Sequence, residues 1–425
     1  MRFTEENFDA TCEACAEVLR LQHPADGVLS GFFRQRPQLG QQDRALVAET
    51  VYAVLRRKRL LEFILDCSAS NSRGTPVRQL VLAAWSVLLG ANLRELEAIA
   101  RRGEMDKIAD GKRIAHGELP LAVACDMPDW LIEMLTAQYG ETELRALAQG
   151  LLQNAPLDLR VNIVKTSRDE ARARLAADGV TVSDMPYSPY GLRVVGKPPI
   201  NRHPLFVAGG LEVQDEGSQL LCMLLGVRRG HMVADFCAGA GGKTLALGML
   251  MRSTGRLNAY DVSEKRLLKM KPRLARSGLS NVHPRRIDDE RDIRLQRLAG
   301  KLDRVLVDAP CSGLGTLRRN PDLKWRQTPE AVAQMQAKQS SILAAASKLV
   351  RVGGRLVYAT CSLLNQENRT VIDQFRASHP QFILKPVSEV LQEERISLAM
   401  DEYLELRPDR HGTDGFFAAV MERRD

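Results

Sequence analysis

Two cysteines that follow apolar, strand-like runs are the residues best suited to covalent chemistry. Cys311 lies in the sequence DAPCSG and Cys361 lies in the sequence YATCS. A structural cysteine is expected inside the apolar run, whereas these two stand beyond its end, in loops rich in serine and glycine. If the two runs are neighbouring parallel strands, both thiols meet Asp308 at the ligand-binding edge of the sheet, within reach of Lys243.

A glycine-rich loop after an earlier apolar run indicates a ligand site at the same edge. The loop comprises Cys237, Ala238, Gly239, Ala240, Gly241, Gly242 and Lys243. Its glycines allow a close backbone approach to a ligand and a tight turn into a helix, and Asp261, about 20 residues on, can accept bonds from ribose hydroxyls. The pattern fits NAD, FAD or S-adenosylmethionine, whereas a phosphate-binding P-loop would need glycine at Cys237.

A thiol pair beside a methyl donor suits the methylation of carbon 5 of cytosine. This carbon is a poor nucleophile, but a thiolate that adds to carbon 6 turns the ring into an enamine, and carbon 5 can then attack a methylsulfonium. An acid near ring nitrogen 3 would hold the proton that neutralises the adduct. The second thiol would take part in the final release, and Lys243 could lower a thiol pKa. On this chemistry alone, either cysteine could be the nucleophile.

Alternating strand and helix patterns after residue 230 would hold these residues. We predict strands at 232–235, 256–261, 304–308 and 355–360, and helices at 244–251, 264–277 and 329–350. Strands separated by helices of this length form a parallel sheet that is covered on both faces. The predicted fold class is therefore α/β, with a doubly wound, Rossmann-like sheet.

The preceding half of the chain has a different pattern. Helical periodicity at 7–21, 43–65 and 76–89 predicts an all-helical domain over residues 1–126. Helices at 129–139 and 167–178, with extended stretches at 159–164 and 191–195, predict a small α+β linker domain over residues 127–220. The sheet domain then spans residues 221–425.

Composition excludes several classes of protein. The chain has 425 residues, of which 44% are hydrophobic and 26% charged, so disordered, collagen-like and coiled-coil proteins are excluded. Its longest apolar run, 80–91, is too short for a membrane span, and an acidic start argues against a signal peptide, which predicts a cytoplasmic protein without membrane contact. The net charge of +8 favours a polyanionic partner. Cys12 and Cys15 form a CxxC with no second ligand pair, so we predict a core role and no metal.

Motifs spread along the chain occur in the order of one known family. They are DAPCSG continuing into RRNPDLKW (318–325), YATCS, QEN (366–368), DGFF (414–417), LRVN (159–162) and QDEGS (214–218). In these segments the sequence resembles the Sun (Fmu) family of RNA cytosine-C5 methyltransferases, over essentially the whole chain. The resemblance implies that Cys361 is the nucleophile and that Cys311 assists product release.

The same resemblance implies the donor site. S-adenosylmethionine would be held by the loop from Cys237 to Lys243, by an acid of the third-strand segment 286–289 that precedes the strand at 304–308, and by Asp261 and Asp308. For the third-strand acid we prefer Asp289 to Asp288. Two departures concern this site. The loop lacks the proline that the family usually has, which predicts a more flexible loop. The third strand also lacks the customary Gly-Asp.

The N-terminal helices resemble the NusB-like RNA-binding domain that is fused to this enzyme in bacteria. The basic cluster 56–59 is a candidate phosphate contact, although a solvated helix face is the alternative for any single arginine. The resemblance implies a monomeric enzyme acting on 16S rRNA or a small-subunit precursor, with Asn162 and the segment 215–218 bracing the domain junction or contacting RNA. The alternatives are a transfer RNA or DNA substrate, or a non-catalytic RNA-binding factor. The last predicts loss of the catalytic residues, which are all intact, and His411 near Asp414 is expected to be a surface residue rather than a base.

Overall fold

The computed structural model describes residues 3–66, 76–101 and 103–425, which form two compact units. The first, the helical unit, consists of residues 1–154 together with 316–329. The second, the sheet unit, consists of residues 155–315 and 330–425. The segment 316–329 therefore packs with helices that lie far from it in the sequence.

Short amphipathic helices build the helical unit around an aromatic core. In order they are α1 (Glu5–Val18), α2 (Ala25–Gln35), α3 (Gln41–Arg56), α4 (Lys58–Asp66), α5 (Val77–Ala83), η1 (Ala84–Leu88), α6 (Leu93–Glu97), α7 (Glu104–Ala115), α8 (Leu121–Cys125), α9 (Asp129–Tyr139), α10 (Glu141–Leu152) and α17 (Leu323–Arg326). Phe8, Phe32 and Trp85 are fully buried, and the indole N–H of Trp85 donates to Oγ1 of Thr50 at 2.8 Å. The buried polar end of the tryptophan is thus satisfied.

The single helix predicted over 43–65 is wrong, because the chain breaks into α3 and α4 at Arg57. Asp126 supplies the physical reason for the break. Its carboxylate accepts hydrogen bonds from the backbone N–H groups of Arg59 (2.9 Å) and Leu60 (3.3 Å) at the start of α4. A helix start needs such acceptors, and this one comes from a residue far along the chain that local periodicity cannot reveal.

A four-stranded antiparallel sheet begins the sheet unit. Its strands are β1 (Leu157–Val161), β2 (Val182–Asp184), β3 (Gly191–Val194) and β4 (Leu211–Val213), in the order β2-β3-β1-β4. It is accompanied by α11 (Arg168–Ala177), η2 (Ile200–Arg202) and α12 (Pro204–Val207). Ser167 and Glu170 form a capping box at the start of α11, which is the helix predicted from this segment.

The larger sheet holds the predicted alternation of strands and helices. Its order is β10-β12-β9-β8-β5-β6-β7, and β11 pairs with β12. The strands are β5 (Met232–Asp235), β6 (Arg256–Asp261), β7 (Val282–Arg286), β8 (Leu302–Asp308), β9 (Val350–Thr360), β10 (Phe382–Lys385), β11 (Leu404–Leu406) and β12 (Phe416–Arg423). The five strands from β5 to β9 run parallel, whereas β10, β11 and β12 are antiparallel additions that we did not predict.

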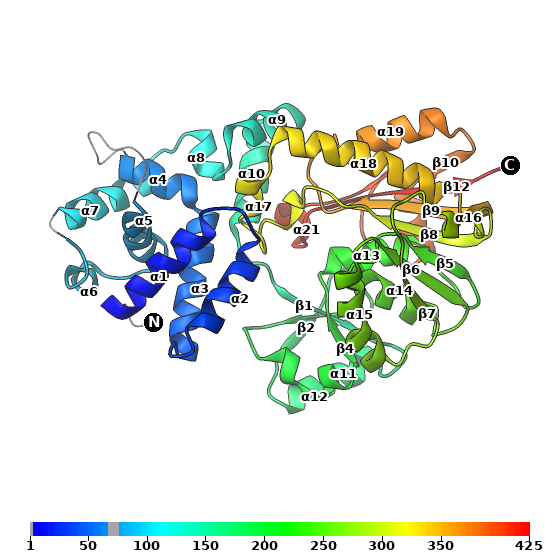
Figure 1. The fold of residues 1–425 in the computed structure, drawn as a ribbon, viewed down its shortest axis with the longest axis horizontal. Helices are drawn as coiled ribbons and strands as arrows, with labels where there is room; N and C mark the ends of the chain where they lie inside the picture. Colours follow the sequence, from blue (N-terminus) through cyan, green and yellow to red (C-terminus); the bar gives the residue numbers. More distant parts are fainter. Residues whose placement is uncertain (1–2, 67–75, 102) are drawn as a thin grey trace. The chain divides into compact units, whose positions relative to one another are not determined.

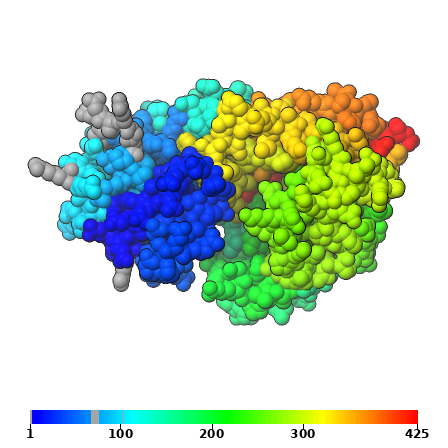
Figure 2. Space-filling model, in the orientation of Figure 1, coloured from blue at the N-terminus to red at the C-terminus, as the bar shows by residue number. Residues whose placement is uncertain are grey.

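Helices cover both faces of this sheet (Figure 1). They are α13 (Glu216–Leu224), α14 (Gly242–Leu250), α15 (Glu264–Ser277), α16 (Ile293–Gln296), η3 (Leu314–Thr316), α18 (Pro329–Ser347), α19 (Arg369–Ser378), α20 (Val387–Glu393) and α21 (Pro408–His411). Within β8, Leu306 packs with α13 and α14, while Val305 and Val307 pack with α18 and α19. The region of α18 and α19, yellow and orange in Figure 2, forms the surface over the face that carries Val305 and Val307. This two-sided burial explains the nearly continuous apolar runs.

Among the described residues, no helix is long and apolar enough to cross a bilayer.

Candidate active site

The two cysteines lie together at the carboxyl ends of adjacent strands. β8 and β9 pair in parallel with Asp308 opposite Ala359, so the loops that follow them leave the sheet side by side. The Sγ atoms of Cys311 and Cys361 are 3.4 Å apart, and both residues are half-buried. The hydrogen bond with Cys361, together with burial and the charge of Glu367, raises the pKa of the Cys311 thiol well above its ordinary value.

An ion pair between Lys243 and Asp308 lies in the same place. Lys243 is in the first turn of α14, and its Nζ is 2.7 Å from Oδ2 of Asp308 at the end of β8. Burial lowers the pKa of Lys243, but the charge and hydrogen bond of Asp308 outweigh it, and the thiols of Cys222 and Cys361 add to them, so the pKa is raised. Lys243 is therefore a cation at neutral pH, and a cation near a thiol favours the thiolate.

In the glycine-rich loop between β5 and α14, a side chain would clash at Gly241 but not at Gly239. Gly241 has a φ of +87°, and a Cβ there would lie 2.5 Å from Cγ of Met270, so glycine is required. A Cβ at Gly239 would meet no atom of the described residues within 4 Å. The N–H of Gly239 donates to Oδ2 of Asp261 at 2.8 Å, which places the predicted ribose-binding acid against the loop.

An arginine restrains the loop where the family's usual proline is missing. Arg273 of α15 donates from Nη1 to the carbonyl oxygen of Ala240 at 2.7 Å. The same guanidinium donates from Nε (3.2 Å) and Nη2 (2.9 Å) to Oε2 of Glu212, a buried residue of β4. The loop is therefore tied to a fixed ion pair, which opposes the flexibility that the sequence predicts.

Comparisons with known proteins agree with this geometry. A family model described as 16S rRNA methyltransferase RsmB/F matches residues 222–422, and a model of the RsmF/B-like ferredoxin-like domain matches residues 127–201. A probable ribosomal RNA small subunit methyltransferase B from Synechocystis sp. is 32% identical over 421 residues, covering 92% of this chain and 93% of that protein. Its counterpart in Bacillus subtilis is 29% identical and covers 98% of both chains. The chain belongs to the RsmB/F methyltransferase family.

Solved structures show the same fold. The crystal structure of PH0851 has a TM-score of 0.76 and 25% identity, covering 99% of both chains. A methyltransferase homolog protein from Pyrococcus horikoshii has a TM-score of 0.61 and 28% identity, covering 71% of this chain and 97% of that one. The predicted family, the Rossmann-like fold and S-adenosylmethionine as the methyl donor are confirmed.

The segment that carries the acid predicted after the third strand begins beside Asp261 in this RsmB/F member. β7 pairs with β6, and the N–H of Ile287 donates to the carbonyl oxygen of Asp261 at 3.1 Å. Asp289 is exposed, and its Oδ1 accepts the N–H of Arg291 at 2.7 Å. Asp288 instead pairs with Arg286 and Arg294, at 3.3 Å each. The donor role of Asp289 stays a prediction.

Asp235 is a buried acid of the site that we did not predict. It ends β5, only 1% exposed, and its Oδ2 accepts the hydroxyl of Thr244 at 2.6 Å. Its Oδ1 is buried without a partner in the described residues. Burial raises the pKa of Asp235 to about 7, with a further increase from the charge of Asp308 and opposing effects from Thr244 and Lys243. The signal available in the sequence was its position as the last residue of a buried strand.

Glu367 is a second unpredicted residue, and it connects the two cysteine loops. Its side chain is fully buried. Oε1 accepts the N–H of Ser312 (2.8 Å) and Nε2 of Gln339 (2.9 Å), and Oε2 accepts the hydroxyls of Ser312 (2.5 Å) and Ser362. Ser312 and Ser362 directly follow Cys311 and Cys361. The family-like motif at 366–368 marked this position but gave no role for it.

The segments 159–162 and 214–218 join the smaller sheet to the larger one. Nδ2 of Asn162 donates to the carbonyl oxygens of Gly209 and Ser277, both at 2.9 Å, and Ser277 ends α15. Asp215 caps α13, and its Oδ2 accepts the N–H of Asp414 at 3.2 Å. Asn162 and Asp215 therefore brace the junction, which is one of the two roles predicted for them.

The basic cluster 56–59 is occupied by contacts within the helical unit. Arg56 donates to Oδ1 of Asn154 (2.6 Å) and to the carbonyl oxygen of Arg318 (2.8 Å). Arg57 pairs with Asp126, Lys58 with Glu62 and Arg59 with Asp129, at 3.5, 2.6 and 2.5 Å. All four side chains therefore have partners within the protein, and a phosphate contact by this cluster stays a prediction.

The remaining predicted groups lie outside this site. Burial raises the pKa of Cys12 to about 12, and Cys15 is buried in the helical core. The described residues contain no group of three or more His, Cys, Asp or Glu that could hold a metal ion. His411 is half-buried rather than at the surface, and its Nδ1 accepts the N–H of Arg407 at 3.0 Å.

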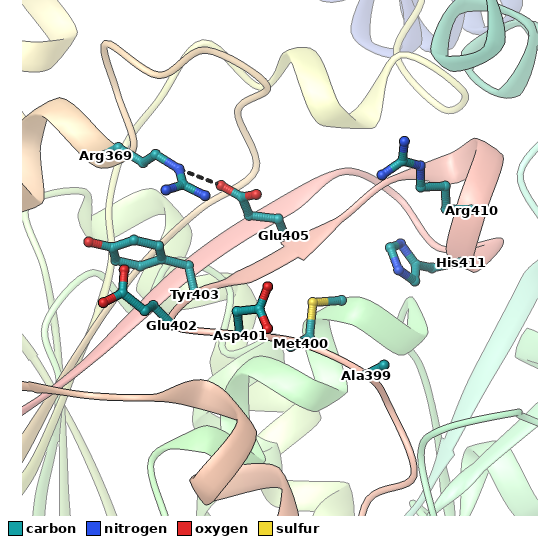
Figure 3. Close-up of a pocket in the computed structure, with 9 residues that line it drawn as sticks. All are labelled: Arg369, Ala399, Met400, Asp401, Glu402, Tyr403, Glu405, Arg410 and His411. Atoms are coloured by element: carbon teal, nitrogen blue, oxygen red, sulfur yellow. Dashed lines mark hydrogen bonds and ion pairs between the residues drawn. The ribbon is translucent and has the colours of Figure 1, made fainter. Parts of the chain in front are cut away.

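A separate cavity in the sheet unit is lined by both acidic and basic side chains (Figure 3). Its volume is about 350 Å³, and it is lined by Arg369, Ala399, Met400, Asp401, Glu402, Tyr403, Glu405, Arg410 and His411. Arg369 is paired with Glu405 at 2.9 Å, as the dashed line shows. The cysteines and the donor loop are not among its lining residues.

Proposed function

We propose that this RsmB/F family member methylates carbon 5 of a cytosine in RNA through a covalent adduct between Cys361 and carbon 6. The observation that carries the proposal is the pair of sulfur atoms 3.4 Å apart next to the Lys243–Asp308 ion pair. Methyl transfer to an amine or hydroxyl needs no thiol, whereas an unreactive ring carbon needs covalent activation. The thiol pair therefore favours a carbon acceptor.

The residues divide the work in three steps. Lys243 favours the thiolate of Cys361, which forms a bond to carbon 6 while ring nitrogen 3 takes a proton from water and donates a hydrogen bond to Asp308. S-adenosylmethionine, when bound, would supply the methyl group to carbon 5 and leave as the thioether. Water then takes the proton of the C5–H bond, ring nitrogen 3 returns its proton to water, and the electron pair of the C6–S bond returns to Cys361. Cys311, in contact with Cys361, assists this release.

The glycine-rich loop and three acids form the proposed donor site. The backbone from Cys237 to Lys243 would contact the donor, with Asp261 at the ribose, Asp289 at the base and Asp308 near the reacting end. The open face at Gly239 and the hydrogen bond of Gly239 to Asp261 fit such a nucleoside.

The proposed substrate is 16S rRNA or a small-subunit precursor, in the cytoplasm. The relatives from Synechocystis and Bacillus subtilis carry the name ribosomal RNA small subunit methyltransferase B. The helical domain 1–126 and the linker 127–220 would contact the RNA, and the domain 221–425 would carry out the methyl transfer. The protein would act as a monomer. A cytosine in a helix must leave the stack before Cys361 can reach carbon 6.

Single-cysteine variants test the mechanism. We expect Cys361→Ser to be inactive and to form no covalent RNA adduct, and Cys311→Ser to accumulate linked RNA because release stalls. Each purified variant is incubated with donor and RNA, and the products are separated on a denaturing gel. If the two variants exchange these phenotypes, Cys361 is not the nucleophile.

Bisulfite sequencing tests the substrate. RNA from a strain lacking the gene should lose one methylated cytosine of 16S rRNA, and expression of the wild-type chain should restore it. If every small-subunit cytosine keeps its mark and a transfer RNA loses one, the enzyme acts on transfer RNA.

A further inference from the structure

The two cysteines of the active site have different electrostatic surroundings. Near Cys361 lie the thiol of Cys311 and Lys243 of α14, which is paired with Asp308. Near Cys311 lie Cys361, the phenol of Tyr358 on β9 and the carboxylate of Glu367. Glu367 bonds twice to the residue after Cys311, Ser312, and once to the residue after Cys361, Ser362.

Hydrogen bonds hold the carboxylate of Glu367 in one position. Four uncharged donors from Ser312, Ser362 and Gln339 saturate its two oxygens. Gln339 also donates to the carbonyl oxygen of Pro310 at 2.9 Å, and the hydroxyl of Tyr358 donates to the carbonyl oxygen of Glu367 at 2.6 Å. The acid is therefore anchored to the residues on each side of Cys311.

We propose that Glu367 is a positioning residue that sets the roles of the two cysteines, keeping Cys311 as the protonated thiol so that Cys361 is the sulfur that adds to the ring. This inference rests on the proposed function, since it explains how the site chooses between two sulfurs that the chemistry alone leaves equivalent. A carboxylate disfavours a second negative charge nearby, and a cation favours one.

The geometry gives the protonated Cys311 a task. Its S–H can donate to the Cys361 sulfur 3.4 Å away, and this hydrogen bond stabilises a negative charge on Cys361. The charge is present before Cys361 adds to the ring and returns when the C6–S bond breaks. Glu367 thereby supports both steps without contacting the substrate.

Alkylation of the two thiols tests the assignment without RNA or donor. The full-length protein is treated with iodoacetamide at a series of pH values, and the modified peptides are quantified by mass spectrometry. In the wild type we expect Cys361 to react at least about tenfold faster than Cys311 at pH 8, since one unit of thiol pKa is a factor of ten in thiolate. Equal rates, or a faster Cys311, would overturn the proposal even if no variant folds.

Two variants then separate charge from structure. Glu367→Gln removes the charge, and we expect the titration of Cys311 to move to lower pH and its alkylation at pH 8 to rise several-fold, while Cys361 changes less. Ser362→Ala removes one donor and keeps the carboxylate, so the titration of Cys311 should not move to lower pH. An unchanged Cys311 titration in Glu367→Gln, or the same shift in Ser362→Ala, contradicts the proposal.

The gel assay distinguishes this failure from failure of the proposed function. If Cys361→Ser still forms the adduct, the proposed function is wrong whatever the alkylation rates are. If the adduct forms only through Cys361 but the two thiols titrate alike, only the role of Glu367 is wrong.

Discussion

A lysine–carboxylate ion pair occurs in each of the two units, and the two pairs differ in burial and in the pKa of the lysine. In the sheet unit, Lys243 lies 2.7 Å from Asp308, whose side chain is 28% exposed. In the helical unit, Lys324 lies 3.8 Å from Asp126, whose side chain is fully buried. The close, half-solvated pair raises the pKa of its lysine, whereas burial lowers the pKa of Lys324 to about 8 despite the charge of Asp126.

The difference agrees with the catalytic role proposed for Lys243 and with a structural role for Lys324. Lys324 also donates to the carbonyl oxygen of Arg56 at 2.9 Å, and its neighbour Trp325 donates to the carbonyl oxygen of Leu55 at 2.7 Å. These contacts fix the segment 316–329 onto α3. The motif RRNPDLKW (318–325) therefore serves, in part, to attach this segment to the helical unit.

The largest effect is expected on activity when Lys243 is changed. Lys243→Met removes the cation that favours the Cys361 thiolate and leaves Asp308 unpaired, so methyl transfer under single turnover should fall by about 10²–10⁴-fold. Lys324→Met is the matched control, and it should retain activity within about tenfold of the wild type. Equal losses in both variants would mean that the two pairs do not differ in function.

A large loss of stability is expected when the charge of Asp126 is removed. Asp126→Asn weakens the cap of α4 and leaves Arg57 and Lys324 without their buried counter-charge, a change that costs about 3–5 kcal/mol. Lys324 can release its proton, which places the expected loss of unfolding free energy at the lower end, about 3 kcal/mol.

Urea denaturation with the control Asp129→Asn checks this estimate. Asp129 pairs with Arg59, but its side chain is 76% exposed, so its removal should change the unfolding free energy by less than about 1 kcal/mol. If Asp126→Asn is as stable as the wild type, the helical-unit pair does not stabilise the fold.

Local sequence patterns predicted the elements that position the site, and failed where contacts are non-local. The boundaries of β5, β6 and α15 agree with their predictions because each has a clear apolar period and a polar residue at its end. The apolar run of β12 says nothing of its direction, so its antiparallel pairing with β9 was missed. The cap that Asp126 gives α4, like the bridge of Glu367, joins residues that are separate in the sequence.

The site likewise contains residues that the sequence predicted and contacts that it did not. Residue types and positions were sufficient to single out Cys311, Cys361, Lys243 and Asp308, since all follow strands or begin a helix at one edge of the sheet. The restraint of the donor loop by Arg273 could not be predicted, because it depends on how α15 packs beside β4.

The smallest effect is expected in the pH dependence of stability, and it distinguishes the two lysines directly. The folded-state pKa of Lys324, about 8, lies below its ordinary value of 10.5, so between these pH values the unfolded chain binds more protons than the folded chain. This lysine therefore makes the unfolding free energy rise with pH from about 8 to 10.5. Lys324→Met should flatten that rise, whereas Lys243→Met should not, because the raised pKa of Lys243 gives the opposite sign. Urea denaturation midpoints of the three proteins at pH 7.5, 9 and 10 measure the slopes, and a Lys324→Met slope equal to that of the wild type would show that Lys324 does not titrate in this range.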